Sequence, residues 1–280
     1  MNYRHIFHAG NFADLFKHAA LLSWINAMQA ENAALRILDT HAGAGLYDLS
    51  DPAQQRSREA EAGVSRLMAR DIPLALKPLA ERVAAYNPKG GVKVYPGSPR
   101  LICDALRPED HYVGCELREE VFGLLSRALN GQGEARLEDG FGFARQEIKR
   151  KPSACYGLLI DPPFEQADDY LQISDTVATC LDAVQGGRGT VSALIWLPLK
   201  DLETLDSFVR RLEAGPLPQT LIAEARLRPL TDPMKMNGCA LVAVNPPKGF
   251  ETAVLAQAEA IVAALGEPTG RAKIWSVGQA

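Results

Sequence analysis

Short apolar runs alternate with longer segments along most of this chain. Five runs pass directly into polar or turn-forming residues, and intervening segments such as 119–130 and 169–184 have the length of crossover helices. This alternation predicts a parallel sheet covered by helices on both faces. The five runs are residues 35–40, 112–117, 135–140, 156–163 and 192–199.

Segments near the two ends complete the predicted architecture. Residues 12–30 carry apolar side chains at helical spacing, which predicts an amphipathic helix. The runs 219–227 and 239–247 are joined by an 11-residue polar loop, which is too short for a crossover helix, so they read as an antiparallel pair. The expected fold is α/β, with a seven-stranded, mostly parallel sheet.

Residues 48–93 are longer than one crossover needs. Leu76, Leu79 and Val83 lie at helical spacing, which predicts a helical insertion subdomain. The main domain then comprises residues 1–47 and 94–280. The insertion has eight Lys/Arg against six Asp/Glu. Its exposed face is either simply solvated or a nucleic-acid contact surface.

Composition limits the function classes without choosing among them. The 280 residues are 47% hydrophobic and 23% charged, as in a globular protein. Five cysteines form no CxxC pair, which favours reduced thiols in a cytoplasmic protein and no metal site. We expect no signal peptide and no membrane span. The net charge of −4 argues mildly against nucleic-acid binding, which usually leaves a basic surface.

A glycine loop follows the first predicted strand. Gly43 and Gly45 end a D-x-x-x-G-x-G pattern that begins at Asp39, and glycines there allow a tight turn and close approach to a ligand. The third glycine of a dinucleotide fingerprint is missing, because Asp48 stands in its place. The loop therefore favours S-adenosylmethionine over NAD, as in Rossmann-like methyltransferases.

Acidic residues end the next two predicted strands. Glu116 is placed to accept hydrogen bonds from ribose hydroxyls, and Asp139-Gly140 is placed to contact the adenine of a cofactor. Each acid alone could instead cap the helix that follows. Agreement among three strand ends favours the cofactor site.

The sequence Asp161-Pro162-Pro163-Phe164 follows the fourth apolar run. The prolines fix φ, so a carboxylate, a backbone carbonyl and an aromatic ring are held in constant relation. An exocyclic amine is a poor nucleophile, and two acceptors, the Asp161 carboxylate and the Pro162 carbonyl, can bind its hydrogens. Phe164 can stack on the base, and Asp161 can accept the released proton.

A similar sequence, Asn245-Pro246-Pro247-Lys248, follows the last apolar run and serves as an internal comparison. It lacks the aromatic residue and belongs to the wrong strand. We interpret it as a strand terminator and assign catalysis to Asp161.

With the opening sequence YRHIFHAGN at 3–11, the pair Lys17-His18 and the sequence YPGSP at 95–99, these patterns resemble the RlmJ family of bacterial methyltransferases. The resemblance spans essentially the whole chain. It implies a Rossmann-like S-adenosylmethionine-dependent fold, S-adenosylmethionine as cofactor, and formation of N6-methyladenosine in 23S ribosomal RNA, either naked or in early assembly. No membrane and no obligatory protein partner is implied.

The resemblance also assigns residues. The expected cofactor-binding set, including the loop glycines, is His18, His41, Gly43, Gly45, Ser98, Glu116, Asp139, Gly140 and Asp161. For the substrate the resemblance implies Tyr3, and we expect His5 and Lys17 to form a substrate-side flap with it. Pro162 and Phe164 complete the expected substrate-binding set from the chemistry argued above. The family usually has Tyr where this chain has Phe164, and stacking survives that difference.

Other interpretations stay open from the residues alone. Lys17 and His18 could lie on a solvated helix face, Ser98 could be a helix cap, and the first residues could be a loose terminus. The same chemistry would also serve a methyltransferase acting on DNA adenine or a protein glutamine amide. A non-catalytic RNA-binding assembly factor with this fold is a further alternative, and a nicotinamide dehydrogenase is the least favoured.

Overall fold

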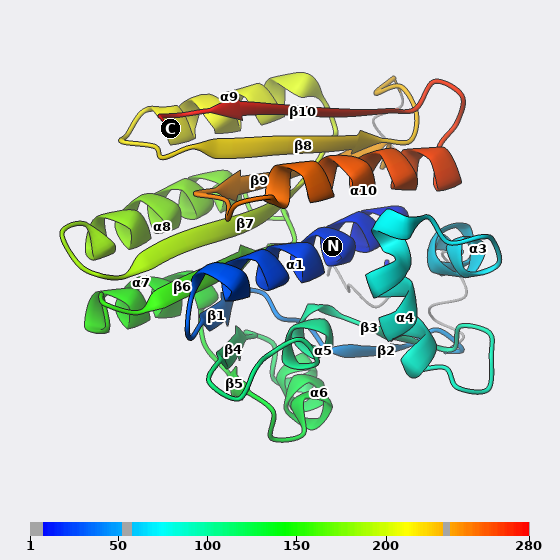
Figure 1. Ribbon diagram of the computed structural model, residues 1–280, viewed down its shortest axis with the longest axis horizontal. Coiled ribbons are helices and arrows are strands. Elements are labelled where there is room, and N and C mark those ends of the chain that lie inside the picture. Colours follow the sequence, from blue (N-terminus) through cyan, green and yellow to red (C-terminus); the bar gives the residue numbers. More distant parts are fainter. Residues whose placement is uncertain (1–7, 52–57, 232–235, 280) are drawn as a thin grey trace.

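An eight-stranded sheet forms the centre of the part of the chain that the structure describes (Figure 1). The computed structural model describes residues 8–51, 58–231 and 236–279. The strand order is β10-β8-β9-β7-β6-β1-β4-β5. The strands are β1 (Arg36–Asp39), β4 (His111–Cys115), β5 (Glu134–Arg136), β6 (Cys155–Ile160), β7 (Thr190–Pro198), β8 (Thr220–Arg226), β9 (Gly238–Val244) and β10 (Arg271–Val277).

The predicted α/β architecture is confirmed, with one correction to the strand count. The five predicted parallel strands pair in parallel, and β8 pairs antiparallel with β9, which lies between β7 and β8. The sheet has eight strands rather than seven, because β10 adds to β8 in antiparallel register. As an edge strand, β10 buries none of its residues fully, so it lacks the continuous apolar run that marks the central strands.

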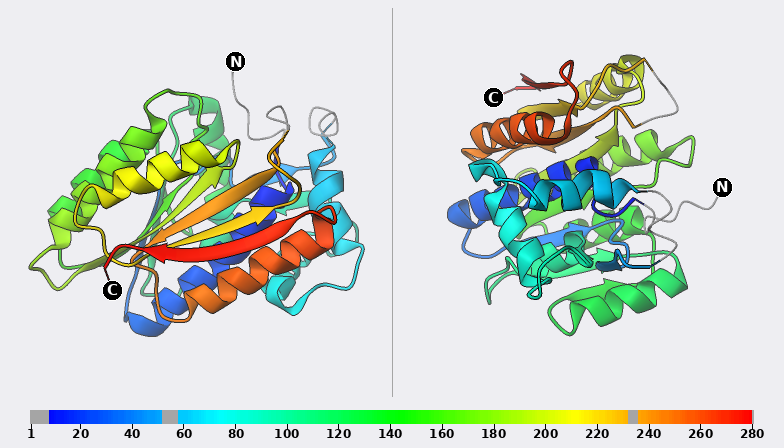
Figure 2. Two further views of the ribbon diagram at one scale, coloured as in Figure 1. Left: turned by 90° about the horizontal axis from the view of Figure 1, so that it is seen from above. Right: turned by 90° about the vertical axis from the view of Figure 1, so that its right-hand side faces the viewer.

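Helices cover both faces of the sheet (Figure 2). Within β6, Leu159 belongs to one hydrophobic core, whereas Leu158 and Ile160 belong to the other, as the alternation of side chains along a strand requires. The first core contains residues of α1 (Phe12–Glu31), α5 (Ser98–Cys103), α6 (Glu119–Leu129) and α10 (Phe250–Leu265). The second contains residues of α7 (Gly140–Arg150), α8 (Asp169–Val184) and α9 (Leu202–Glu213).

Helix α1 lies deeper than an amphipathic surface helix would. Its N-cap is Asn11, whose side chain accepts a hydrogen bond from the Asp14 backbone N–H. The Trp24 indole donates to Ser192 of β7, and Gln257 of α10 donates to the Ala19 carbonyl. Because α10 and the segment between β1 and β4 cover it, the first ten residues of α1 are buried, polar ones included.

The segment between β1 and β4 is built from short elements. Its apolar side chains join the core around α1 rather than forming one of their own, as Val64, Leu76 and Leu79 show. The division at residues 48 and 93 into a domain and a subdomain stays a prediction. The elements are β2 (Leu46–Asp48), the π-helix η2 (Glu61–Ser65), α3 (Arg66–Met68), the 3-10 helix η3 (Leu74–Leu76), α4 (Lys77–Ala85) and β3 (Val94–Pro96), with β2 and β3 paired as a small antiparallel sheet.

Two features of the described residues bear on function classes. None of the described helices is long and apolar enough to cross a membrane. Within the same residues, no group of three or more His, Cys, Asp or Glu side chains could hold a metal ion. The five cysteines are free thiols, and four of them are buried.

Candidate active site

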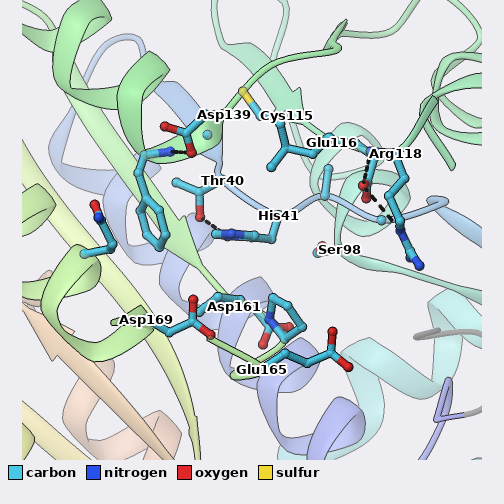
Figure 3. Close-up of a pocket in the computed structure, with 18 of the residues that line it drawn as sticks. Thr40, His41, Ser98, Cys115, Glu116, Arg118, Asp139, Asp161, Glu165 and Asp169 are labelled. Atoms are coloured by element: carbon cyan, nitrogen blue, oxygen red, sulfur yellow. Dashed lines mark hydrogen bonds and ion pairs between the residues drawn. The ribbon is translucent and has the colours of Figure 1, made fainter. Parts of the chain in front are cut away.

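A cavity of about 500 Å³ opens at the carboxyl ends of β1, β4 and β6 (Figure 3). Strand β1 pairs with β4 on one side and β6 on the other, so the chain order reverses there, and ligands of open α/β sheets bind at such a point. The predicted residues that line the cavity are Lys17, His18, His41, Gly43, Ser98, Glu116, Asp139, Gly140, Asp161 and Pro162.

The glycine loop shapes one wall of this cavity. Gly43 lines it with a φ of +67°, and a Cβ there would lie 2.6 Å from the Tyr47 hydroxyl. Gly140, the first residue of α7, packs so closely that a Cβ would lie 2.1 Å from the Thr40 carbonyl oxygen. Only glycine permits these approaches, so both positions hold the loop and the helix end against the cavity.

Gly45 has a different place from the one the sequence suggested. It is absent from the cavity lining, and with a φ of +79° it faces α5 and α6. A Cβ there would lie 2.8 Å from the Ala128 Cβ. Its carbonyl oxygen accepts a hydrogen bond from the Gly97 N–H. Gly45 therefore supports the loop from behind, and its direct contact with a cofactor stays an unsupported prediction.

The two strand-end acids both line the cavity. Glu116 accepts a hydrogen bond from the Arg118 N–H at 2.9 Å. Asp139 caps α7, accepting from the backbone N–H groups of Phe141 and Gly142. Capping and cofactor binding are thus compatible for Asp139, because the cap holds its carboxylate at the cavity wall.

A buried carboxylate that the sequence analysis did not assign lies behind the loop. Asp39, 1% exposed, accepts hydrogen bonds from Ser98 at 2.9 Å and from the Tyr112 hydroxyl at 3.2 Å. Burial raises the pKa of Asp39 to about 6, against the opposing effect of the Ser98 hydrogen bond. The sequence feature that could have assigned Asp39 to the site is its position as the first residue of the D-x-x-x-G-x-G pattern.

His41 is a neutral group at ordinary pH. Burial lowers its pKa to about 4. Its Nδ1 lies 2.8 Å from the Thr40 hydroxyl, and its ring packs edge-on against Phe141 with centroids 4.9 Å apart. His41 can therefore offer a hydrogen bond and an apolar ring face to a ligand without adding charge.

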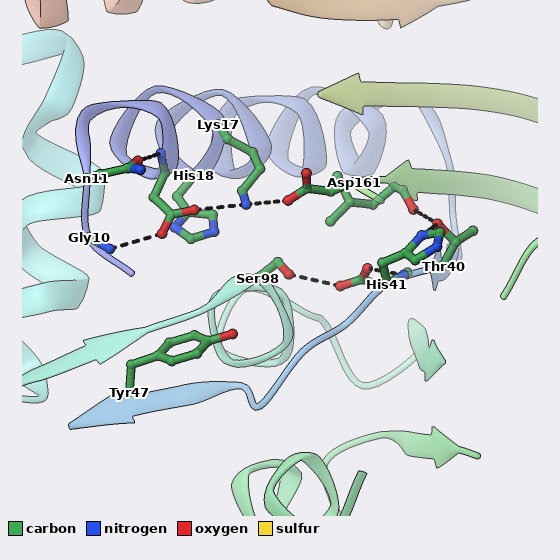
Figure 4. Close-up of polar contacts among 12 residues, drawn as sticks. Gly10, Asn11, Lys17, His18, Thr40, His41, Tyr47, Ser98 and Asp161 are labelled. Carbon is green, nitrogen blue, oxygen red and sulfur yellow. Dashed lines mark hydrogen bonds and ion pairs between the residues drawn. The ribbon is translucent and has the colours of Figure 1, made fainter. Parts of the chain in front are cut away.

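Asp161 follows β6 directly and is held by Lys17 of α1 (Figure 4). The Lys17 ammonium donates to Asp161 Oδ2 at 2.5 Å and contacts Asp14 Oδ1 at 2.9 Å. Burial alone would lower the pKa of Lys17, but the two carboxylates outweigh it and raise that pKa well above the usual range. Lys17 is therefore a permanent cation that fixes the Asp161 carboxylate.

Pro162 and Pro163 line the cavity, whereas Phe164 lies outside its lining. Phe164 has a φ of +53°, a conformation that costs a non-glycine residue on the order of 1–3 kcal/mol. Its ring packs against Tyr170 and Trp196, with centroids 5.1 and 5.8 Å away. The structure thus gives the Phe164 ring a packing role on Tyr170 and Trp196, and stacking on a base stays a prediction.

The second proline pair lies at the opposite edge of the sheet. Strand β9 runs antiparallel to β7, so Asn245 follows it near the start of β7. The Asn245 side chain donates to the Val191 carbonyl oxygen at 3.0 Å. Asn245 is therefore remote from the cavity, and the interpretation of this sequence as a strand terminator fits the structure.

The remaining predicted residues belong to the N-terminal region. Tyr3 and His5 lie outside the described residues, so the proposed flap is untested. Gly10 and Asn11, which precede α1, contact the insertion. The Asn11 side chain donates to Glu59 at 2.9 Å, and the Gly10 carbonyl oxygen accepts a hydrogen bond from the Val64 N–H. In α1, His18 is buried, with Nδ1 2.8 Å from the Tyr95 hydroxyl, and so does not lie on a solvated face.

The chemistry of the cavity wall fits a sulfonium cofactor better than a dinucleotide. Its lining includes six carboxylates against three Lys or Arg side chains. Such a wall favours a cationic ligand, whereas a pyrophosphate is normally held by a helix N-terminus and basic or amide donors. The volume also suits one small ligand. The fold and this site define an S-adenosylmethionine-dependent methyltransferase.

Comparison with known proteins agrees with this class. A family profile described as "Ribosomal RNA large subunit methyltransferase D, RlmJ" matches residues 32–277, and the chain belongs to that family. It is 32% identical to ribosomal RNA large subunit methyltransferase J of Escherichia coli over 255 residues, covering 90% of this chain and 89% of the relative. It is 29% identical to the Haemophilus influenzae protein of the same name, with the same coverage.

A solved structure shares the whole fold. The crystal structure of a Legionella pneumophila protein superposes with a TM-score of 0.85, at 24% identity, covering 96% of this chain and 98% of that one. At this identity the likeness concerns the fold alone. Because the superposition covers 96% of this chain, it includes the insertion as well as the sheet.

Proposed function

We propose that this protein transfers a methyl group to N6 of an adenine in 23S ribosomal RNA, and that it does so in the cytoplasm. Membership of the family and the names of the relatives support a large-subunit ribosomal RNA substrate. The observation that carries the chemistry is the Asp161 carboxylate, fixed by Lys17 at the rim of the cofactor cavity and followed by two prolines.

This geometry suits an amine whose lone pair is delocalised into a ring. The hydrogen bond from Lys17 uses Oδ2 of Asp161, and within the described residues Oδ1 has no partner. Oδ1 and the Pro162 carbonyl oxygen can accept the two N–H groups of the adenine amine, which favours a more tetrahedral nitrogen. Since Pro162 has a fixed φ and is buried, this acceptor pair is organised before the substrate binds.

S-adenosylmethionine, when bound, supplies the electrophilic methyl group. For it we propose Glu116 at the ribose, Asp139 and Gly140 at the adenine, and Ser98, His18 and His41 along the wall, beside Asp161. Within this set the chain's own contribution is to position and to exclude water, since most of these side chains are partly or fully buried.

The proton released on methyl transfer goes to Asp161 or to water beyond it. Lys17 cannot accept it, because Lys17 is already a stable cation between two carboxylates. The same ion pair keeps the Asp161 side chain from turning away while the substrate nitrogen gains positive charge. General acid–base groups of this kind contribute about 10²–10⁴-fold to rate.

The substrate must present its adenine outside a stacked helix, because the amine is otherwise out of reach. We propose naked or early-assembly RNA as the substrate form, with Phe164 and the flap residues Tyr3 and His5 on the substrate side. Lys17, predicted to belong to the flap, is buried in α1 and acts on the substrate through Asp161. A chain of net charge −4 is expected to bind RNA weakly and in a salt-sensitive way.

Mass spectrometry of modified nucleosides tests the proposal. Ribosomal RNA from cells with and without the gene should differ by one N6-methyladenosine in 23S RNA. Purified protein with isotopically labelled S-adenosylmethionine should label protein-free 23S RNA in preference to DNA or protein. Label appearing in DNA adenine or in a glutamine amide instead would replace this substrate with one of the two alternatives.

A further inference from the structure

A second cavity, of about 510 Å³, opens at the ends of β8 and β10, on the same edge of the sheet as Asp161. The strand register sets this position. Strand β8 runs in the direction of β7, because both are antiparallel to β9, so Arg226 ends β8 at the carboxyl edge. Arg271 begins β10 directly opposite Arg226, and Figure 1 shows β8 and β10 side by side. With strands about 4.8 Å apart, β8 lies about 14 Å from β6, a distance that a few nucleotides span.

The lining of this cavity has the chemistry of a phosphate site. Guanidinium groups and hydroxyls are the side chains that most often bind phosphate oxygens of nucleic acids. One carboxylate also lines the cavity, that of Asp201, and it is engaged in capping α9 through the Thr204 N–H at 2.7 Å. The basic and hydroxyl side chains of the lining are Arg226, Arg228, Arg271, Thr231 and Thr269.

All three arginines of the lining have donors that form no hydrogen bond with the nearby carboxylates of the described residues. Arg226 lines the cavity, is 5% exposed and pairs with Glu224, but its buried Nε has no hydrogen-bond partner within the described residues. Arg271 is exposed and makes no ion pair with any described residue. Arg228 forms an ion pair with Glu267 at 3.1 Å through its Nε, but the geometry is not that of a hydrogen bond, so this buried Nε also lacks a hydrogen-bond partner within the described residues. A buried donor without a partner destabilises the protein, and an anionic ligand that accepts its hydrogen bond would remove that cost.

We propose that this cavity binds a backbone phosphate of the RNA substrate, on the side of the target adenine away from the cofactor. The inference rests on the proposed function, because it takes RNA as the substrate. It also explains how a chain of negative net charge binds RNA. The contact is made by a local group of arginines at the same edge of the sheet as Asp161, whereas the cofactor cavity has an excess of carboxylates. Phosphate contacts of this kind position the RNA chain along the protein, and the choice of base is left to the catalytic site.

The test compares two double variants of the full-length protein. Arg228→Gln with Arg271→Gln removes two cations from the cavity. Arg210→Gln with Arg211→Gln removes two from the far end of α9, outside the lining, where Arg210 is 75% exposed and pairs with Asp206. Fluorescence anisotropy with a labelled 23S RNA fragment is measured over a series of KCl concentrations, and calorimetry with S-adenosylhomocysteine checks the cofactor site.

The cavity variant should bind the fragment about tenfold or more weakly, and its salt dependence should fall by about one unit or more in the slope of log K against log salt. The control variant should match the wild type, and both should keep cofactor affinity. Equal RNA binding by the two variants, while the wild type methylates the fragment, would overturn this inference alone. Failure of the wild type to methylate any RNA would overturn the proposed function.

Inorganic phosphate separates an RNA phosphate from a free anion. If phosphate raises the melting temperature of the wild type but not of the cavity variant, while RNA binding is the same in both, the cavity takes a free anion only and the inference is wrong. If the inference is right, phosphate should compete with the RNA fragment in the wild type and lose most of that effect in the cavity variant.

Discussion

The ammonium of Lys17 lies 2.5 Å from Oδ2 of Asp161, joining the first helix to a residue 144 positions later in the chain. Both partners are largely buried, and Asp14 contacts the same ammonium from its other side at 2.9 Å. Removal of one partner from a buried pair leaves an uncompensated charge, so the effect on stability exceeds that of the pair's own attraction.

This relationship predicts non-additive stability effects. Lys17→Met should cost about 3–5 kcal/mol, because Asp14 and Asp161 then face each other without the cation. Combining it with Asp161→Asn should restore part of that loss. Urea denaturation of the single and double variants gives the coupling. Purely additive losses would show that the two groups act independently.

The buried pair Asp39 and His41 predicts opposing pH effects on stability. The pKa of Asp39 is raised from 3.8 to about 6, so its contribution is full below pH 3.8 and is lost as pH rises through 6. The pKa of His41 is lowered from 6.5 to about 4, so its contribution is full above pH 6.5 and is lost as pH falls through 4. In the wild type the two changes of unfolding free energy with pH have opposite signs and offset each other.

Single substitutions should separate the two contributions to the pH dependence of the unfolding free energy. Relative to wild type, the unfolding free energy of Asp39→Asn should rise by about 3 kcal/mol between pH 4 and pH 6.5, and that of His41→Asn should fall by about the same amount. Urea titrations at the two pH values decide this. Variants that follow the wild type in parallel would mean that neither group titrates with a shifted pKa.

Gly140 offers a test of the cofactor wall. In Gly140→Ala the new Cβ would lie 2.1 Å from the Thr40 carbonyl oxygen, so the start of α7 must move and S-adenosylhomocysteine affinity should fall at least about tenfold, as misplaced contacts usually cause. Gly123→Ala in α6, where the nearest atom is the end of the Arg127 side chain at 3.8 Å, is the matched control and should bind normally. Calorimetry on both variants provides the comparison, and equal affinity would contradict the assignment of this wall.

Phe164 tests the stacking role. Base–aromatic stacking is worth roughly 1–3 kcal/mol, so Phe164→Ala should lose roughly 5- to 150-fold in kcat/KM on one RNA fragment. Phe164→Tyr keeps the ring and should stay near normal. Because the ring also packs on Tyr170 and Trp196, thermal melts must show a folded Ala variant. A folded Phe164→Ala enzyme with full activity would leave Phe164 a packing role only.

Most of the fold was readable from the sequence, because buried parallel strands give continuous apolar runs. Strand β10 and helix α10 were not foreseen: β10 is a half-exposed edge strand, and α10 is so rich in apolar residues that it shows little periodicity. In the site, the strand-end residues Glu116, Asp139 and Asp161 could be placed because parallel strands end at one edge.

Contacts between side chains far apart in the sequence could not be predicted in this way. Lys17 was expected to face the substrate, and nothing in its local sequence indicates that it meets Asp161. Gly45 belongs to the glycine pattern, yet its neighbours across space, Ala128 and Pro99, turn it into a support for the loop. Such pairings depend on tertiary packing, which local periodicity does not encode.

The central claim, that Asp161 carries transfer to the adenine amine, is tested most directly by quantifying N6-methyladenosine formed in one protein-free 23S RNA fragment. Wild type and the Asn245→Ala and Lys248→Ala variants of the remote proline pair should form it at similar rates. Asp161→Ala should fall by about 10²–10⁴-fold while remaining folded. An active Asp161→Ala enzyme alongside an inactive Asn245→Ala enzyme would place the chemistry at the other edge of the sheet and contradict the mechanism.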